Sequence, residues 1–346
     1  MKKIYIIYYI SLFIILISCT KKEVTRLPIN NKLTYNNFIS IKNYCYSSSF
    51  IYDSLLIFIA ECDSNLFHVY NKNSLKLITK FGTIGRGPYD FNFPFPFNSN
   101  TSSSIKKQDY YFFDLNLPRI ISINFEKASN GYSLDECISS KTIDKQLFSS
   151  NELNIVNDNV IGQRLNSSDG LFFIYSHQSK GEKWIDYIPK LRFNKKYIGD
   201  VYSGTLCSNE KNIIYGSRYF DEILFFDSDG KLIKEYYFSE ISKPILSKQY
   251  SGVAHEAKLY IVDIYGTSDY CYVLRSGISM IKLKDSLNYP TLVLKFNWNS
   301  TLISVMEIET LPQCMCVDEE AKIMYCIVED SDCSELVKLV KISLTN

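Results

Sequence analysis

Cysteine is the residue type whose spacing in this chain first suggests chemistry. Of the ten cysteines in 346 residues, Cys314 and Cys316 are separated by one methionine, and Cys326 and Cys333 follow closely. Side chains at positions i and i+2 of a β-strand point to the same face, so the first two could hold a common ligand. A zinc site takes four Cys or His ligands, however, and no histidine lies near. We therefore expect buried core side chains and no metal site, with a disulfide within residues 314–333 as the alternative.

The three histidines, His68, His177 and His255, form no catalytic pattern. His68 lies within a strand-like run and is expected to pack in the core, whereas His255-Glu256 lacks the second histidine of a zincin motif. The sequence contains neither a P-loop nor a Gly-x-Ser-x-Gly elbow. It therefore predicts a protein that is not an enzyme and that carries no cofactor.

Cys19 is the cysteine with a recognisable chemical role. Met1–Cys19, MKKIYIIYYISLFIILISC, has two lysines, an uncharged apolar run and a small residue before the cysteine, which is the pattern of a secretory signal. Its last four residues resemble the bacterial lipobox, which implies cleavage after Ser18 and lipidation of the Cys19 thiol. A retained transmembrane helix is the alternative, but the apolar run is shorter than the roughly 20 residues that a bilayer requires. We expect residues 1–18 to be a lipoprotein signal peptide.

The residues after Cys19 are expected to link the lipid to the folded domain. Residues 20–31, TKKEVTRLPINN, are polar, include a proline and show no periodicity, so residues 19–31 are predicted to form a short tether. Thr20 follows the cleavage site where an inner-membrane lipoprotein would favour Asp, which indicates the outer membrane. Lys21-Lys22-Glu23 resembles the acidic surface-export signal of Bacteroidetes lipoproteins only loosely, so both faces of that membrane stay open.

The composition supports a large folded domain and argues against a nucleic-acid partner. Hydrophobic residues make up 46% of the chain and aromatic residues 15%, enough for a sizeable core. The chain has 38 basic and 37 acidic residues, and removal of Lys2 and Lys3 with the signal leaves a net charge of −1. Without excess positive charge, binding to a phosphate backbone lacks its electrostatic driving force.

A repeated unit of short strands organises the rest of the chain. Residues 212–238 contain three apolar runs separated by polar turns, and residues 55–81 repeat that order. Six such units occur at a period of about 53 residues, which is in the range of propeller blades. The run expected to be the second strand of each unit is Leu55–Glu61, Tyr110–Asp114, Val160–Arg164, Ile213–Gly216, Leu259–Asp263 and Ile323–Val328. In the fifth unit, residues 270–274 and 280–283 compete for the third strand.

These units predict an all-β fold, a six-bladed β-propeller over residues 32–346. The last unit ends at its third strand, near Leu344, and an additional extended stretch, Lys32–Ile41, precedes the first unit. We expect this stretch to supply the outer strand of the last blade, because closure of the ring removes the exposed sheet edges of an open array. The alternatives are a pair of β-sandwiches, which would give no reason for six similar units, and a β-solenoid, which would need shorter repeats.

A glycine- and proline-rich loop connects the first two units and carries a family resemblance. In residues 81–97, FGTIGRGPYDFNFPFPF, the residues Gly82, Gly85, Gly87, Pro88 and Phe91 match the G-x-x-G-x-G-P-x-E-F signature. This pattern is similar to that of the TolB-like six-bladed propeller lipoproteins of Bacteroidetes, which are relatives of the NHL-like propellers. The aspartate at position 90 stands where that family usually has Glu. The resemblance implies the fold and the cell envelope, and no general activity.

Binding in propellers usually involves loops on one face, so we expect the candidate residues there. Arg86, Tyr89 and Asp90 come from the glycine- and proline-rich loop, and Arg119 and Arg218 from connections in the second and fourth units. Arginine can contact carboxylates or phosphates with two hydrogen bonds, which suits recognition. The structural alternative is that Arg86 and Asp90 only hold their own loop in place.

Three functions remain after these exclusions. The first is a non-catalytic, lipid-anchored binding module for an envelope protein, a peptide or a glycan. The second is a structural component of an outer-membrane assembly. The third is a glycan-active envelope enzyme that uses carboxylates around the central axis, which spacing along the sequence alone does not show. Because a fold does not imply a function, the anchor and the absence of a catalytic motif favour the first.

Overall fold

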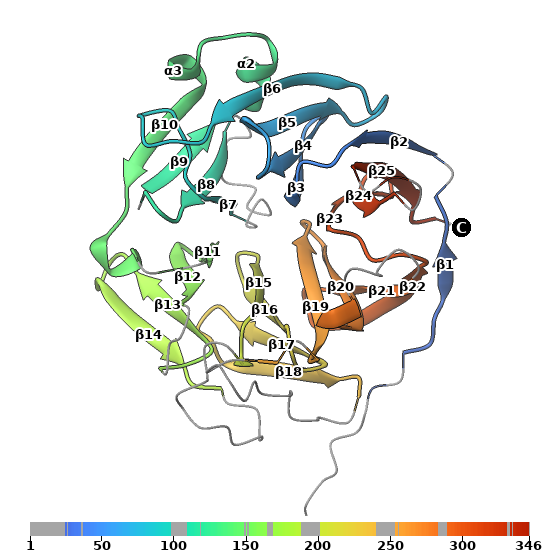
Figure 1. Ribbon diagram of the computed structural model, residues 1–346. Helices are drawn as coiled ribbons and strands as arrows, with labels where there is room; N and C mark the ends of the chain where they lie inside the picture. The colour runs from blue at the N-terminus through green and yellow to red at the C-terminus, as the bar shows by residue number, and fades with distance from the viewer. Residues whose placement is uncertain are drawn as a thin grey trace, which may run out of the picture.

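The structure is a computed structural model in which the chain forms a ring of six sheets around a central axis (Figure 1). It describes residues 25, 27–35, 37–97, 109–117, 119–148, 150, 152–164, 169–187, 201–239, 253–254, 256–282, 289–330, 333 and 335–345. The expected signal peptide, Cys19 and His255 lie outside these residues. Among the described helices, none is long and apolar enough to cross a membrane.

Each sheet is one blade of a propeller, which confirms the predicted fold class. Blade one consists of β3 (Tyr46–Tyr52), β4 (Leu55–Ala60), β5 (Asn65–Asn71) and β6 (Leu77–Thr83), and blade two of β7 (Pro94–Pro96), β8 (Tyr110–Asp114), β9 (Arg119–Ile123) and β10 (Ile138–Thr142). Blade three consists of β11 (Glu152–Val156), β12 (Asn159–Gln163), β13 (Phe172–Ser176) and β14 (Gly181–Ile185). Blade four consists of β15 (Gly204–Ser208), β16 (Asn212–Ser217), β17 (Glu222–Asp227) and β18 (Leu232–Tyr237).

The last two blades also include strands from the start of the chain. Blade five consists of β19 (Lys258–Gly266), β20 (Tyr270–Ser279), β21 (Thr291–Asn297) and β22 (Leu302–Ile308), with β1 (Asn31–Leu33) parallel to β22. Blade six consists of β23 (Cys314–Asp318), β24 (Ile323–Glu329), β25 (Leu336–Ser343) and β2 (Asn37–Lys42), which is antiparallel to β25. The stretch that was expected to form one outer strand therefore contributes to two blades. Its first part joins blade five because Leu33 is buried beside Met306 and Ile308.

The strand order in blade five differs from the prediction. The run around Leu259–Asp263 belongs to β19, the first and innermost strand, and not to the second strand of the blade. The second strand is β20, and β21 is the third, so neither residues 270–274 nor 280–283 occupy that place. Apolar periodicity identifies a strand but does not give its rank within a blade, and the long β19–β20 hairpin resembled the pair expected later in the unit.

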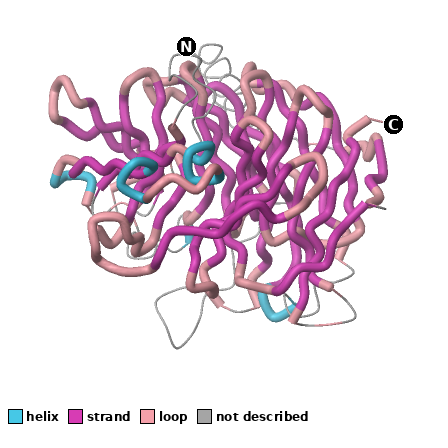
Figure 2. The backbone as a smooth tube through the Cα atoms, turned by 90° about the horizontal axis from the view of Figure 1, so that it is seen from above, coloured by secondary structure: helices cyan, strands magenta, loops and turns pink. Residues whose placement is uncertain are grey.

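The core lies between neighbouring blades. All six residues of β4 are buried, as are five of the six residues of β17. Both faces of each sheet are covered by the adjacent blades, so the apolar residues run continuously, through all of β4 and residues 223–226 of β17, instead of alternating with polar residues. Two short helices, α2 (Phe125–Ser129) and α3 (Leu134–Cys137), interrupt this pattern between β9 and β10, on the outer side of blade two (Figures 1 and 2).

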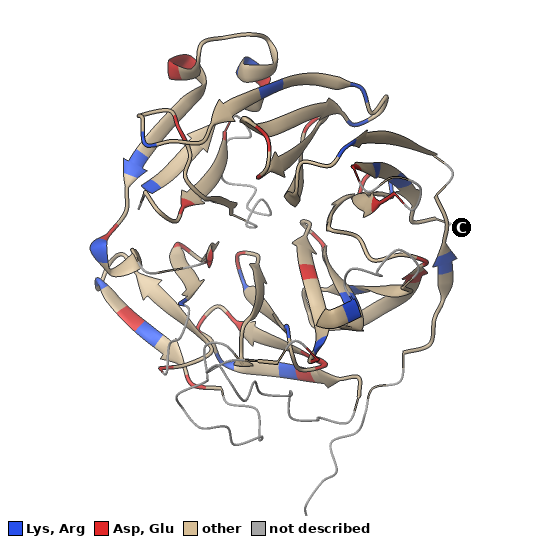
Figure 3. Ribbon diagram, viewed as in Figure 1, with Lys and Arg blue, Asp and Glu red and all other residues tan. Residues whose placement is uncertain are grey.

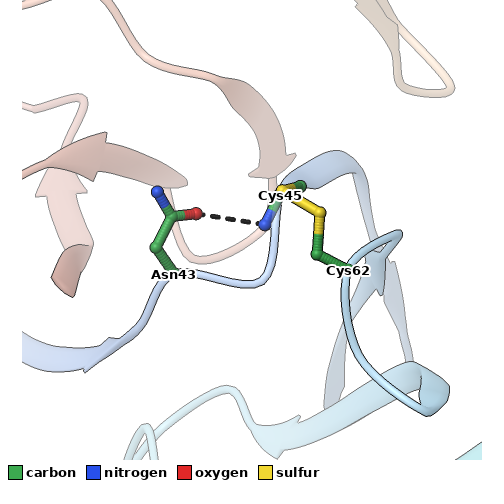
Figure 4. Close-up of a disulfide and its surroundings, with 3 residues drawn as sticks. All are labelled: Asn43, Cys45 and Cys62. Carbon is green, nitrogen blue, oxygen red and sulfur yellow. Dashed lines mark hydrogen bonds between the residues drawn. A yellow bond between two sulfur atoms is a disulfide. The ribbon is translucent and has the colours of Figure 1, made fainter. Parts of the chain in front are cut away.

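A disulfide joins Cys45, just before β3, to Cys62, just after β4 (Figure 4). The alternative of a disulfide within residues 314–333 is wrong: Cys314, Cys316 and Cys326 are buried free thiols, and Cys333 is free and partly exposed. Cys326 is paired across the sheet with Met315, so it faces away from Cys314 and Cys316. The expected core packing is confirmed for Cys314, Cys316 and Cys326, but not for Cys333.

Removal of this disulfide should destabilise the propeller. The bond closes a loop of 17 residues, for which chain entropy predicts a stabilisation of about 3 kcal/mol. The double variant Cys45→Ser, Cys62→Ser should lose that amount in urea unfolding followed by intrinsic fluorescence. A Cys333→Ser control should match the wild type, and reduction of the wild type should reproduce the double variant. Equal unfolding midpoints for the double variant and the oxidised wild type would contradict the pairing.

Candidate functional site

The topology places all five predicted binding residues at one end of the blades. Successive strands of a blade run in opposite directions, so the connection into a blade and its second loop lie on the same face, here called the entry face. Arg86, Tyr89 and Asp90 lie between β6 and β7, Arg119 begins β9, and Arg218 follows β16. Viewed from its edge, the ring has strands running between two loop-bearing faces (Figure 2).

The Gly/Pro loop, residues 84–93, is folded around the carboxylate of Asp90. Asp90 accepts a hydrogen bond from the Thr83 hydroxyl at 2.5 Å and one from the Gly87 backbone N–H at 2.8 Å. These bonds, with a smaller contribution from the Arg119 charge, lower the pKa of Asp90. A Cβ atom at Gly87 would lie 2.7 Å from the same carboxylate, and one at Gly85 would also overlap it. The two glycines are therefore needed to give the carboxylate room.

Phe91 fixes the end of this loop to the core. Its side chain is fully buried and packs edge-on against Phe67, with 4.9 Å between the ring centroids. Gly82 has a φ of +82°, and a Cβ atom there would lie 2.9 Å from the Phe67 ring. The backbone N–H of Phe91 also donates to Thr83 at 2.8 Å. The loop therefore begins and ends at positions set by the packing of blade one.

Asp114 and Arg119 hold the other side of the loop to blade two. The fully buried Asp114 carboxylate accepts hydrogen bonds from the backbone N–H groups of Asn92 and Phe93, at 3.0 and 3.1 Å. Arg119 lies 3.5 Å from Asp114 and donates to the backbone carbonyl of Pro88 at 3.2 Å and to that of Asp90. The loop backbone is thus bound by charged groups that are themselves fixed in the second blade.

The side chains that remain outside this framework are apolar or cationic. Ile84 is 54% exposed, Tyr89 37% and Phe93 39%. Arg86 is also exposed and makes no hydrogen bond or ion pair with a described residue. Tyrosine and arginine are the residue types most often found at the centres of protein interfaces. Because the backbone of the loop is already fixed, binding through these side chains would cost little further backbone entropy.

The structure thus separates the predicted residues into three groups. Arg86 and Tyr89 are exposed on the Gly/Pro loop, whereas Asp90 and Arg119 bind loop backbone, in keeping with the structural alternative for Asp90. Arg218 is exposed in blade four, across the ring from this loop. The part that each plays in binding stays a prediction.

Two carboxylates near the central axis were not identified from the sequence. Glu152 begins the innermost strand of blade three and accepts a hydrogen bond from the Leu206 backbone N–H at 3.2 Å. Burial raises the pKa of Glu152 to about 8; the charge of Asp263 adds to the rise, and that of Arg218 opposes it. Burial also raises the pKa of Asp263, on β19, to about 6. No local sequence signal reveals this proximity, because the residues come from blades three, four and five.

A second missed cluster surrounds His68 in blade one. His68 is fully buried, as expected, with its Nδ1 3.0 Å from the Tyr46 hydroxyl and its Nε2 2.7 Å from Asp63. Lys80 lies 2.8 Å from the same carboxylate. Burial lowers the pKa of His68, and hydrogen bonds from Lys80 and His68 hold the pKa of Asp63 well below its usual range despite burial. The adjacent disulfide joins the same two chain segments that contain Tyr46 and Asp63. The disulfide and the hydrogen bonds of His68 therefore stabilise blade one together.

Metal chemistry has no visible site in the described part of the chain. No group of three or more His, Cys, Asp or Glu side chains among those residues is placed to hold a metal ion. The buried thiols of Cys314 and Cys316 pack in the apolar core between blades six and one.

The fold and the site together define a six-bladed propeller with a loop on its entry face whose backbone is fixed and whose exposed side chains are partly apolar.

Comparisons with known proteins show the same fold. A member of the DUF4221 family from Bacteroides vulgatus aligns with a TM-score of 0.58 and 13% identity, covering 90% of this chain and 98% of that one. A Bacteroides fragilis protein whose export is inferred aligns with a TM-score of 0.50 and 12% identity, covering 94% and 93%. No protein-family model and no curated protein sequence matches the chain. At these identities the likeness shows the propeller architecture alone.

Variants of the Gly/Pro loop should separate its framework from its exposed side chains. Asp114→Ala removes the acceptor of two partly buried backbone N–H groups and the carboxylate paired with Arg119, so the free energy of unfolding should fall by about 3 kcal/mol. Arg86→Ala and Tyr89→Ala should each change it by no more than about 0.5 kcal/mol. Urea unfolding measures all three. A loss of several kcal/mol for Arg86→Ala would instead place Arg86 in the framework.

Glu152 should make the stability of the protein depend on pH. Its pKa of about 8 exceeds the ordinary 4.5, so between these values the folded chain holds a proton that the unfolded chain releases. Stability contributed by this group is therefore complete below about pH 4.5 and is lost as the pH rises towards 8. Glu152→Gln should flatten the urea-unfolding profile over that window. Glu210→Gln, which removes an exposed carboxylate, should keep the wild-type slope; an unchanged slope in Glu152→Gln would show that Glu152 is ionised throughout.

Proposed function

We propose that this chain is an exported, lipid-anchored propeller of the cell envelope that binds a protein or peptide through the Gly/Pro loop, without catalysis. The observation that carries the proposal is the loop itself. Its backbone is fixed by Asp90, Asp114 and Arg119, while Arg86, Tyr89 and two further apolar side chains face solvent. A backbone that the chain's own hydrogen bonds hold in place around exposed Tyr and Arg side chains fits a binding surface.

The proposed location has separate support. The lipobox-like sequence before Cys19 and the resemblance to TolB-like propeller lipoproteins both favour the cell envelope, and Thr20 favours the outer membrane. One structural neighbour is a Bacteroides protein whose export is inferred, and the Cys45–Cys62 disulfide suits an oxidising compartment outside the cytoplasm. Acidic and basic residues are interspersed around the ring, which argues against a nucleic-acid partner (Figure 3).

The test is affinity purification of the tagged, lipidated protein from detergent-solubilised envelopes. The variant Arg86→Ala, Tyr89→Ala should reduce recovery of a specific partner by more than tenfold, because both residues lie where an interface would be centred. Tyr132→Ala, Lys141→Ala removes one exposed tyrosine and one exposed cation from the outer side of blade two, and it should leave recovery unchanged. Equal recovery with both variants would contradict a role of the loop in binding.

Two further outcomes distinguish the alternatives. A partner recovered in a fixed ratio, and lost in a Cys19→Ala variant, would indicate a structural component of a membrane assembly. Recovery of the protein alone would move the search to immobilised peptides and glycans, with the same pair of variants. Cys19→Ala should itself abolish incorporation of labelled palmitate and leave an uncleaved precursor, whereas continued labelling would exclude Cys19 as the lipidation site.

A further inference from the structure

The N-terminal strap, Thr25 and residues 27–33, lies against the outer rim of the ring. The backbone N–H of Thr25 donates to the carbonyl of Tyr237, on the outer strand of blade four, at 2.7 Å. Leu27 packs against the core cluster that blades four and five share. Asn30 then exchanges two hydrogen bonds of 2.8 Å with the backbone of Val305, on the outer strand of blade five. The strap therefore begins at the boundary between blades four and five.

Beyond Asn30 the strap stays fixed to the rim. Residues 31–33 form β1, parallel to β22, and Lys32 lies 3.1 Å from Glu307. The chain then continues into β2, which pairs with β25 of blade six. Much of the segment expected to be a tether, residues 19–31, is thus bound to the propeller. The link from Cys19 to the strap therefore ends at Thr25.

This link is short compared with the propeller. Six Cα–Cα steps join Cys19 to Thr25, and a fully extended chain covers about 20 Å in that distance. A compact domain of roughly 315 residues has a radius of gyration of about 20 Å, so it is about 50 Å across. A lipid on Cys19 therefore cannot reach beyond the near side of the ring.

We propose that the rim of blades four and five faces the membrane and that its partner is the lipid surface. The proposal rests on the proposed lipidation of Cys19. The chain reaches the rim at Thr25, so the anchor holds this rim within about 20 Å of the headgroups. Three isoleucines, each about half exposed, lie on the strap itself and on the outer strands of blades four and five: Ile29, Ile233 and Ile303. Apolar side chains at this position suit the boundary between headgroups and acyl chains.

The same geometry directs the Gly/Pro loop away from the membrane. In a ring of six, blade one lies opposite blade four and blade two opposite blade five (Figure 1). The Gly/Pro loop connects blades one and two, so it is on the side of the ring farthest from the strap. A partner would therefore approach Arg86 and Tyr89 from the aqueous compartment, with no steric conflict with the bilayer.

The experiment measures energy transfer from two labelled positions to a headgroup-labelled acceptor lipid. The lipidated full chain, in a Cys333→Ser background, carries a donor dye at Ile233→Cys or Ile78→Cys and is reconstituted in phosphatidylcholine liposomes. These isoleucines are 51% and 42% exposed on the outer strands of the opposite blades four and one. Transfer efficiency should be at least about twofold higher from position 233. Equal transfer, or more from position 78, would overturn the proposed orientation.

A linker insertion tests whether the short link causes the difference in energy transfer between the two labelled positions. Ten Gly/Ser residues inserted after Glu23 leave the strap and Cys19 unchanged but extend the link to about 50 Å. The difference between the two positions should then disappear, and a persisting difference would overturn the link-length argument. A protein that incorporates no palmitate and stays unbound to liposomes would overturn the anchor itself. Neither the energy-transfer result nor the linker result affects the partner test of the loop variants. The proposed orientation and the proposed binding function can therefore fail separately.

Discussion

Every blade of this propeller must bury both faces of its sheet, and the rest of the structure depends on that constraint. A neighbouring blade covers each face, so strands such as β4 and β17 are apolar almost throughout. A polar side chain in this setting needs hydrogen-bond partners, as His68 has in Tyr46 and Asp63. What remains for recognition is the loops at the strand ends and the few residues near the axis.

The Gly/Pro loop shows how a connection between two blades becomes a defined surface. Asp90, and Asp114 and Arg119 from blade two, form hydrogen bonds with backbone groups of the loop. These charged side chains therefore fix the shape of the loop. Two glycines leave space for Asp90, and Phe91 occupies the core of blade one. The side chains that contribute least to stability are consequently those best placed to meet a partner. In this loop, the residues that hold the backbone in place and the residues proposed to bind a partner are different residues.

The sequence was sufficient to predict the repeated unit, but not the contacts between the units. Apolar runs and polar turns predicted the six blades, because both are local signals. Neither the position of β19 within its blade nor the disulfide partner of Cys45 is encoded in a local signal. The first was predicted wrongly, and the second was not predicted. The sequence motif located the Gly/Pro loop, but only the structure shows that Asp90 and Arg119 face inwards to the backbone. Glu152 and Asp263 escaped detection for the same reason, since separate blades bring them together.

The pairing of β2 with β25 has a consequence for how the chain folds. Asn37 lies opposite Lys341, so one of the first strands of the chain bonds with one of the last. Contacts this distant in sequence form late, because the whole intervening chain must first be brought to a compact arrangement. Until the last strand of the chain is in place, the ring would remain open with two unpaired strand edges. That interval is when this protein is most exposed to aggregation and to proteases.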